Sequence, residues 1–249
     1  MKIIALKYYK NGEMQEAFAM GGSLAPEKID MDKRYPSSLQ NYLIDTGKEV
    51  ILIDTGLPKE TPDFKKEPDA KLYVGEKIQT FPEALEAAGY KPQDIAKIVV
   101  THKHPDHTGE LRMFPNAKIF ISRTDADALG LKGDNIVRVD YTDGPYHNFD
   151  KSQKIADSLV MLPAPGHTKG NSIAVLEYDG KFWMFHGDIS YTDEALRRNE
   201  LSVVFEDKDE ARKSEEKVRE FIQLNPTVYL STHTPEGIEH LEKEEIMRL

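Results

Sequence analysis

Three histidines and one aspartate lie within six residues of this chain, in the stretch His102-x-His104-x-Asp106-His107. Folding does not require imidazoles this close together, because each needs solvent, a hydrogen bond or a group that takes its lone pair. Neutral imidazoles and carboxylates bind zinc and, with less selectivity, manganese, iron and cobalt. Four candidate ligands are too many for one tetrahedral ion that keeps an open position, so two neighbouring divalent ions are the better interpretation. The alternatives are a histidine-rich surface turn and a single structural zinc.

The segments around this cluster indicate how it is presented. Residues 95–100 form an apolar run that predicts a buried strand ending where the polar residues begin. Alternation along an extended chain places His102 and His104 on the same side. Pro105 disfavours a regular helix through the cluster, since the residue before a proline is pushed toward extended geometry. We therefore expect the cluster on a loop at a strand end, where functional sites are commonly built.

This stretch resembles the signature of the metallo-β-lactamase superfamily, whose members share an αββα sandwich. The resemblance implies an α/β fold with two mixed, mostly antiparallel sheets flanked by helices. It also implies further metal ligands at later strand ends: a histidine after a strand, an aspartate that ends a strand, and a last histidine near the C-terminus. His167, Asp188 and His233 occupy such places in this sequence.

Each of these three residues follows an expected strand. His167 comes after residues 158–162 and two prolines, and Asp188 ends a predicted hairpin that turns at Asp179-Gly180. His233 follows residues 228–231. An aspartate at a strand end can lend one oxygen to each of two ions, which a histidine nitrogen cannot do. The hypothesis is one ion held by His102, His104 and His167, a second held by Asp106, His107 and His233, and Asp188 bridging them.

The segment Asp188-Ile189-Ser190-Tyr191-Thr192 resembles the matching segment of the N-acyl-homoserine lactonases of this superfamily, which degrade quorum-sensing lactones. In that family the tyrosine contacts the substrate carbonyl, which implies the same role for Tyr191. By position alone, Tyr191 could equally be an ordinary half-buried tyrosine, because the chain has 11 of them.

The expected function is therefore hydrolysis of a lactone, an N-acyl-homoserine lactone or a related one. A water shared by two ions, its pKa lowered to about 7, would attack as hydroxide. Tyr191 would donate a hydrogen bond to the oxyanion. The resemblance further implies that Asp106 passes the proton to the leaving alkoxide. The two ions are expected to be zinc, although iron, manganese and cobalt suit the same ligands.

Rival functions use a similar set of residues. A thioesterase of the glyoxalase II type would have the same ligands, but it normally carries a helical C-terminal region, and too little chain follows His233. A phosphodiesterase or ribonuclease is disfavoured by the acidic composition. A true β-lactamase usually lacks the bridging aspartate, and a flavo-diiron oxidoreductase would have glutamate in place of His104. A metal-binding scaffold without turnover is the alternative that is not an enzyme.

Composition narrows the class of protein. The net charge of −10 disfavours a nucleic-acid surface, and the absence of cysteine excludes disulfides and thiolate ligands. A chain of 249 residues with 39% hydrophobic residues is expected to form a single domain over residues 1–249. We see no signal peptide and no membrane-spanning run. A cytoplasmic protein acting on a small molecule, without a membrane partner, is the expectation, while the oligomeric state is not indicated.

Four other polar residues are expected outside the ligand set. Asp54, before Thr-Gly, should satisfy turn amides, and the superfamily resemblance also implies that it supports the site without binding a metal. His147 and His240 are expected to be exposed, and His186 to be a core histidine, or at best a neighbour of the ligands.

Residues 57–80 are polar and predict a long surface excursion. Its apolar residues could form a lip over the metals or could pin the loop to the body of the protein; they are Phe64, Leu72, Tyr73 and Val74, with Met20 and Leu24 as possible companions from the loop 18–24. Residues 132–154 are expected to be irregular.

Overall fold

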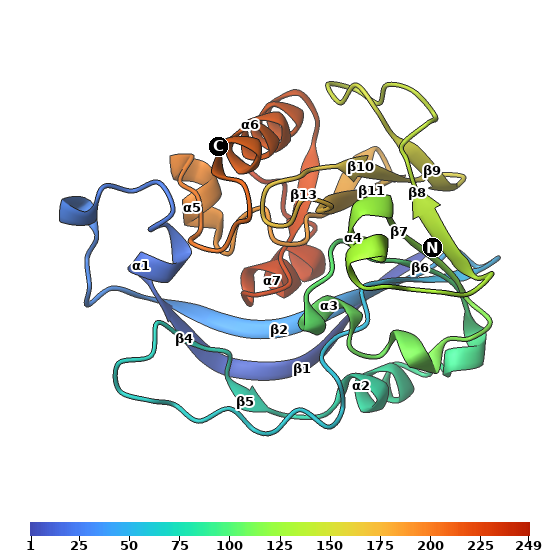
Figure 1. Cartoon of the computed structure of the whole chain (residues 1–249), viewed down its shortest axis with the longest axis horizontal. Coiled ribbons are helices and arrows are strands. Elements are labelled where there is room, and N and C mark those ends of the chain that lie inside the picture. The colour runs from blue at the N-terminus through green and yellow to red at the C-terminus, as the bar shows by residue number, and fades with distance from the viewer.

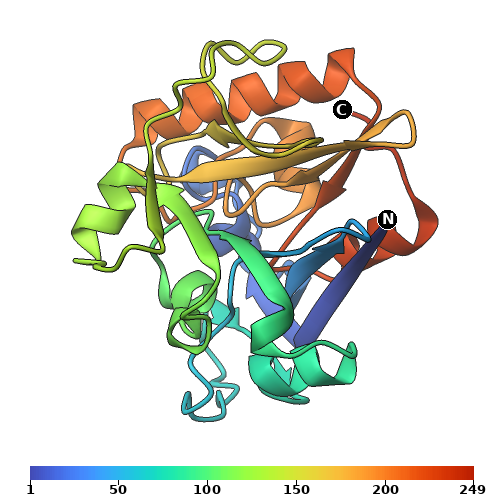
Figure 2. The ribbon, with the colours of Figure 1, turned by 90° about the vertical axis from the view of Figure 1, so that its right-hand side faces the viewer.

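The computed structural model describes residues 1–249 as two β-sheets packed face to face, with helices on both outer faces (Figures 1 and 2). Figure 2 shows the layers in sequence from top to bottom: helix α6 (Lys208–Leu224), the second sheet, the first sheet and helix α2 (Phe81–Ala87). The expected αββα sandwich is confirmed.

The first sheet combines an antiparallel half with a parallel half. Its order is β4-β1-β2-β3-β6-β7-β8, and β5 also pairs with β1. The connections β1-β2-β3 are antiparallel, whereas β3, β6, β7 and β8 run parallel. The strands are β1 (Lys2–Gln15), β2 (Arg34–Asp45), β3 (Val50–Ile53), β4 (Leu72–Tyr73), β5 (Glu76–Lys77), β6 (Ile95–Val99), β7 (Lys118–Ser122) and β8 (Ile136–Val139).

The second sheet has the order β13-β12-β11-β10-β9, and only its β12–β13 pair is parallel. Strands β10, β12 and β13 consequently run in the same direction, so their carboxyl ends reach the same edge of the sandwich. The strands are β9 (Gln153–Ala156), β10 (Leu159–Pro163), β11 (Ser172–Tyr178), β12 (Lys181–Phe185) and β13 (Thr227–Leu230).

Three apolar clusters hold the four layers together, and strand β12 contributes to two of them. Trp183 and Phe185 lie between the sheets, while Phe182 and Met184 point to the other face, which α6 covers with Phe221 and its neighbours. A third cluster joins the first sheet to α2. Each large side chain buried in this way stabilises the fold by about 1.5–3 kcal/mol.

The remaining helices are short and lie close to the loops that carry the polar cluster. They are α1 (Glu16–Ala19), α3 (Pro105–Thr108), α4 (Arg123–Ala128), α5 (Asp193–Arg198) and α7 (Glu236–Lys243), with 3₁₀ turns at Pro26–Lys28, Pro92–Asp94 and Leu111–Met113. Side chains cap the first turns of four helices: Thr80 caps α2, Ser122 caps α4, Thr192 caps α5 and Asp207 caps α6.

Several elements differ from the sequence prediction. Strand β8 and the start of β9 lie in residues 132–154, which were expected to be irregular. Pro105 does not prevent helix formation: it occupies the first position of the one-turn helix α3, where a missing N–H costs nothing, while His104 before it is extended as predicted.

His240 was expected to be exposed and is instead buried. It lies on α7, where its Nδ1 contacts the Tyr229 carbonyl at 2.8 Å and its Nε2 contacts Asp193 Oδ2 at 3.1 Å. The glutamates that surround His240 in sequence suggested a solvated position, but helical periodicity turns this one side chain inward.

No helix of the chain combines the length and the apolar character that crossing a bilayer requires.

Candidate metal centre

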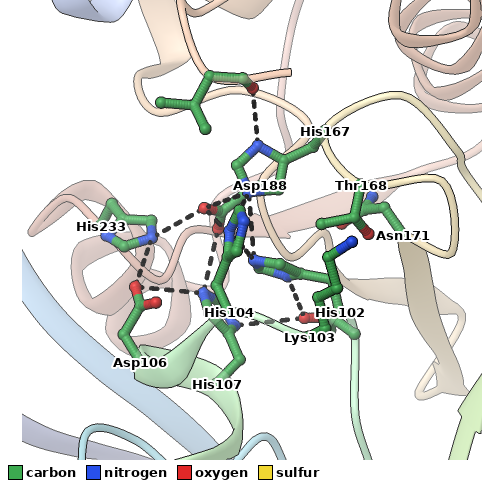
Figure 3. Close-up of polar contacts among 12 residues, drawn as sticks. His102, Lys103, His104, Asp106, His107, His167, Thr168, Asn171, Asp188 and His233 are labelled. Atoms are coloured by element: carbon green, nitrogen blue, oxygen red, sulfur yellow. Dashed lines mark hydrogen bonds and ion pairs between the residues drawn. The ribbon is translucent and has the colours of Figure 1, made fainter. Parts of the chain in front are cut away.

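All seven predicted ligand residues converge at one edge of the sandwich, where strands β6, β10, β12 and β13 end (Figure 3). Segments as far apart as His102 and His233 meet there because these strands present their carboxyl ends to the same side. The residues fall into two groups, each compact enough to hold an ion. The first group is His102, His104, His167 and Asp188, and the second is Asp106, His107 and His233.

The three histidines of the first group direct ring nitrogens at a common point. His104 Nδ1 lies 3.1 Å from His102 Nε2 and 2.9 Å from His167 Nε2, and the two Nε2 atoms are 3.2 Å apart. Nitrogens bound to one tetrahedral zinc at 2.0–2.1 Å would be about 3.3 Å apart. The observed triangle therefore has nearly the size that an ion between the rings requires.

The second group is slightly more open. His107 Nε2 lies 3.5 Å from Asp106 Oδ2, which in turn lies 3.4 Å from His233 Nε2. Asp106 and His107 come from the one turn of α3, and His233 follows β13. Two imidazoles and a carboxylate form a donor set that suits zinc or a similar divalent ion.

Asp188 lies between the two groups. Its Oδ1 is 3.3 Å from His107 Nε2, and its Oδ2 is 3.1 Å from His233 Nε2 and 3.2 Å from His167 Nε2. The carboxylate thus faces imidazoles of both groups.

Hydrogen bonds on the far side of the rings hold three of the imidazoles in place. His107 Nδ1 contacts Asp54 Oδ2 at 2.7 Å, His167 Nδ1 contacts the Val204 carbonyl at 2.8 Å, and His102 Nδ1 contacts the Thr101 hydroxyl. A ring that donates from Nδ1 keeps its Nε2 lone pair free for a metal. Asp54 supports the site from behind, as expected.

The electrostatics of the site also favour cations. Burial opposes a charge on His107, but Asp106, Asp54 and Asp188 together raise its pKa well above the usual value. Burial likewise opposes ionisation of Asp106, yet His107 and His233 lower its pKa to about 2. His107 Nε2 and Asp188 Oδ1 are buried without a hydrogen-bond partner. Buried polar atoms without partners are costly, and a bound divalent ion would satisfy both, so these residues fit the expected metals.

A cavity of about 200 Å³ opens onto the two groups. Its polar side is formed by His104, Asp106, Asp188 and His233, and its apolar side by Met14, Phe18, Leu72 and Val204.

Tyr191 also lines this cavity. Its ring is stacked on Phe18 with centroids 5.1 Å apart and meets His233 edge-on at 5.2 Å. Burial, reinforced by Asp188 and Asp106, raises the pKa of the Tyr191 phenol well above its usual value, so the hydroxyl stays protonated and able to donate.

The remaining histidines lie outside the two groups. His147 is exposed, as expected. His186 is buried in the core, stacked on Tyr229 with centroids 3.9 Å apart. Both roles expected for apolar residues of the 57–80 excursion occur. Leu72 forms a lip on the cavity, whereas Phe64 packs on Tyr9 and holds the loop against the body of the protein.

Other contributors to the site could not be identified from the sequence. Val204 lies in a segment without a distinctive motif, and its carbonyl reaches His167 only through tertiary packing. Phe18 falls in the loop 18–24, and its side chain is placed over Tyr191 by the turn of α1.

Comparisons with known proteins agree with this geometry. Residues 36–233 match the family model described as the metallo-beta-lactamase superfamily. The chain is 24% identical to an N-acyl homoserine lactonase of Bacillus cereus over 199 residues, which cover 77% of this chain and 79% of the relative. It is 29% identical over 146 residues to the uncharacterized protein YobT of Bacillus subtilis, covering 52% of this chain and 53% of YobT.

Solved structures show the same fold. A quorum-quenching N-acyl homoserine lactone hydrolase superposes with a TM-score of 0.72 at 19% identity, covering 94% of this chain and 93% of the other. AidC, a dizinc quorum-quenching lactonase, superposes with a TM-score of 0.67 at 19% identity, covering 94% and 88% of the two chains. The two sheets, the gathered histidines and aspartates and the matched family model lead to one conclusion: this chain belongs to the metallo-beta-lactamase superfamily and is a hydrolase related to the quorum-quenching lactonases.

Proposed function

We propose that this protein is a lactonase that uses two divalent metal ions to open an N-acyl-homoserine lactone or a related lactone. The observation that carries the proposal is the juxtaposition of the two ligand groups with Tyr191 and an apolar wall in a single cavity. A lactone with an acyl side chain needs both a polar reaction centre and an apolar surface.

The proposed ligand assignment follows the two groups. His102, His104 and His167 would hold one ion, and Asp106, His107 and His233 the other, with Asp188 contributing to both. When bound, the ions would lower the pKa of a water to about 7 and polarise the substrate carbonyl. Zinc is the first expectation for both ions.

The residues of the chain would do the rest of the chemistry. Tyr191, protonated across the neutral pH range, would donate a hydrogen bond to the carbonyl oxygen as negative charge develops on it. Asp106 would be ionised at neutral pH. The resemblance to the lactonases supports its role as the group that accepts the proton of the attacking water and delivers it to the leaving alkoxide. Phe18, Leu72 and Met14 would cover the acyl portion and exclude water from it.

The test combines elemental analysis of the purified protein with a panel of substrates. The panel contains acyl-homoserine lactones, simple γ-lactones, glutathione thioesters and phosphodiesters. We expect two divalent ions per chain and turnover of lactones without cleavage of thioesters or phosphodiesters. Thioester cleavage without lactone cleavage would overturn the proposal in favour of a glyoxalase II-like enzyme, and phosphodiester cleavage alone would assign a nuclease-like activity.

A further inference from the structure

A buried carboxylate outside the two groups ties together the two loops that carry the three histidines of the first group. Asp125, in the first turn of α4, has no accessible surface and takes part in no ion pair. Its Oδ2 accepts a hydrogen bond from the Lys103 amide at 3.0 Å and another from the Thr168 hydroxyl at 2.7 Å. Lys103 separates His102 from His104, and Thr168 follows His167, so one oxygen fixes both segments.

The packing around Asp125 shows that this carboxylate fits its place closely. A Cβ atom added at Gly170 would lie 2.5 Å from Asp125 Oδ1 and 2.2 Å from Ser122 Oγ. Glycine at position 170 is thus what allows the loop after His167 to approach the start of α4. A longer side chain at position 125 would displace that loop, whereas asparagine keeps the size and removes the charge.

Asp54 is a second buried carboxylate that supports the site. Asp54 accepts hydrogen bonds from the Thr101 amide at 2.7 Å and the Thr101 hydroxyl at 2.8 Å, and it contacts His107 Nδ1. Asp54 therefore supports His107 directly and His102 through the Thr101 hydroxyl, while Asp125 contacts neither His107 nor His233. Asp125 is thus the buried aspartate whose hydrogen bonds reach the two segments that carry His102, His104 and His167.

The geometry points to Asp125 as a positioning residue for the metal site formed by His102, His104 and His167. Hydrogen bonds to a carboxylate are about twice as strong as those to a neutral acceptor. Outer partners of metal ligands contribute about 10–100-fold to metal affinity, and because Asp125 acts one residue away from the ligands we expect the lower end, about tenfold. The inference rests on the proposed pair of ions, but its readout is metal affinity.

The experiment uses the full chain, stripped of metal with a chelator and titrated with Co²⁺ by visible absorption and with Zn²⁺ against a chromophoric competitor. Asp125→Asn is measured in two backgrounds, each with one group disabled. In the His233→Ala background, where the first group remains, we expect Asp125→Asn to weaken binding about tenfold. In the His104→Ala background, where the second group remains, affinity should change less than about threefold. Asp127→Asn, an exposed carboxylate on the same helix, is the matched control.

Three outcomes would overturn the inference: an equal loss in both backgrounds, no loss in the His233→Ala background, or a loss only in the His104→Ala background. If Asp125→Asn does not fold by circular dichroism, Thr168→Val removes one of the two donors and should give the same selective loss, about threefold or more. A wild-type chain that binds no divalent ion would instead refute the proposed function itself, so the two failures are distinguishable.

Discussion

At the scale of single residues, Asp188 is the side chain that contacts ligands of both groups. Its two oxygens face His107, His167 and His233 at 3.1–3.3 Å. A carboxylate placed in this way could compensate part of the charge of each of two ions, and it would fix the distance between them.

Asp188→Asn should therefore leave about one metal ion per chain and lower kcat/KM by at least about 100-fold, because an amide offers a single neutral oxygen. Elemental analysis and lactone kinetics on the same preparation measure both effects. Asp127→Asn provides the control for loss of a carboxylate elsewhere. Two ions per chain in Asp188→Asn would contradict the bridging role.

Tyr191→Phe tests a different residue without touching the ligands. Removal of one hydrogen-bond donor to a developing oxyanion costs about 10²–10³-fold in kcat. We expect a loss of this size in kcat with metal content unchanged. Tyr178→Phe, which alters an exposed hairpin residue, should leave kcat as it is. A Tyr191→Phe enzyme with full kcat would show that the phenol is simply part of the cavity wall.

At the scale of elements, the cavity is closed by segments that come from different parts of the first sheet. Phe18 comes from α1, Leu72 from β4 and Met14 from the extended end of β1, where β1 also pairs with β4. The length of β1 thus brings all three apolar side chains over the site. The volume of about 200 Å³ leaves room for a short acyl chain.

Leu72→Ala and Phe18→Ala should widen this cavity and favour longer acyl chains. Each additional buried methylene is worth about 0.8 kcal/mol, so room for one or two more should raise the ratio of kcat/KM for a long-chain over a short-chain substrate about tenfold. Phe64→Ala is the control, because Phe64 packs on Tyr9 outside the cavity. A similar change of the ratio in Phe64→Ala would mean that the whole 57–80 excursion, and not the lip at Leu72, determines chain length.

The elements that carry the site could be predicted from the sequence because their signals are local. Apolar runs that stop at Pro-Gly-His or at Gly-Asp identify strand ends without knowledge of the fold. The family resemblance then indicates which residues at these strand ends act together as metal ligands. Helix α7 and the inward position of His240 could not be predicted, since glutamates flank His240 and its partner Asp193 is distant in sequence. The role of Asp125 also depends on the approach of two loops that only packing brings together.

At the scale of the whole molecule, a second polar cluster lies behind the site and links helices α5 and α7. Asp193, at the start of α5, pairs with His240 of α7 and with Arg197. These helices follow Tyr191 and His233 in the chain, so the cluster connects both sides of the cavity wall. Burial opposes the charge on His240, but the bond and charge of Asp193 raise its pKa to about 8.

This pair makes stability depend on pH. A histidine whose pKa rises on folding from 6.5 to about 8 stabilises the fold fully below pH 6.5, and the contribution disappears as the pH rises through 8. We expect wild-type, metal-free protein to lose about 1–2 kcal/mol more unfolding free energy between pH 6 and pH 9 than His240→Gln does. Urea unfolding of both proteins at both pH values measures this difference. The metal-site histidines titrate in both proteins, so their contribution cancels. Parallel pH dependence in the two proteins would refute the assignment.

The proposed arrangement is a pair of cations enclosed by seven side chains from four segments of the chain. Anomalous diffraction from crystals grown with zinc, recorded on both sides of the zinc absorption edge, tests it directly. We predict two anomalous peaks about 3.5–4 Å apart, one among His102, His104 and His167 and the other among Asp106, His107 and His233, with Asp188 between them. A single peak, or no peak at these residues, would contradict the claim.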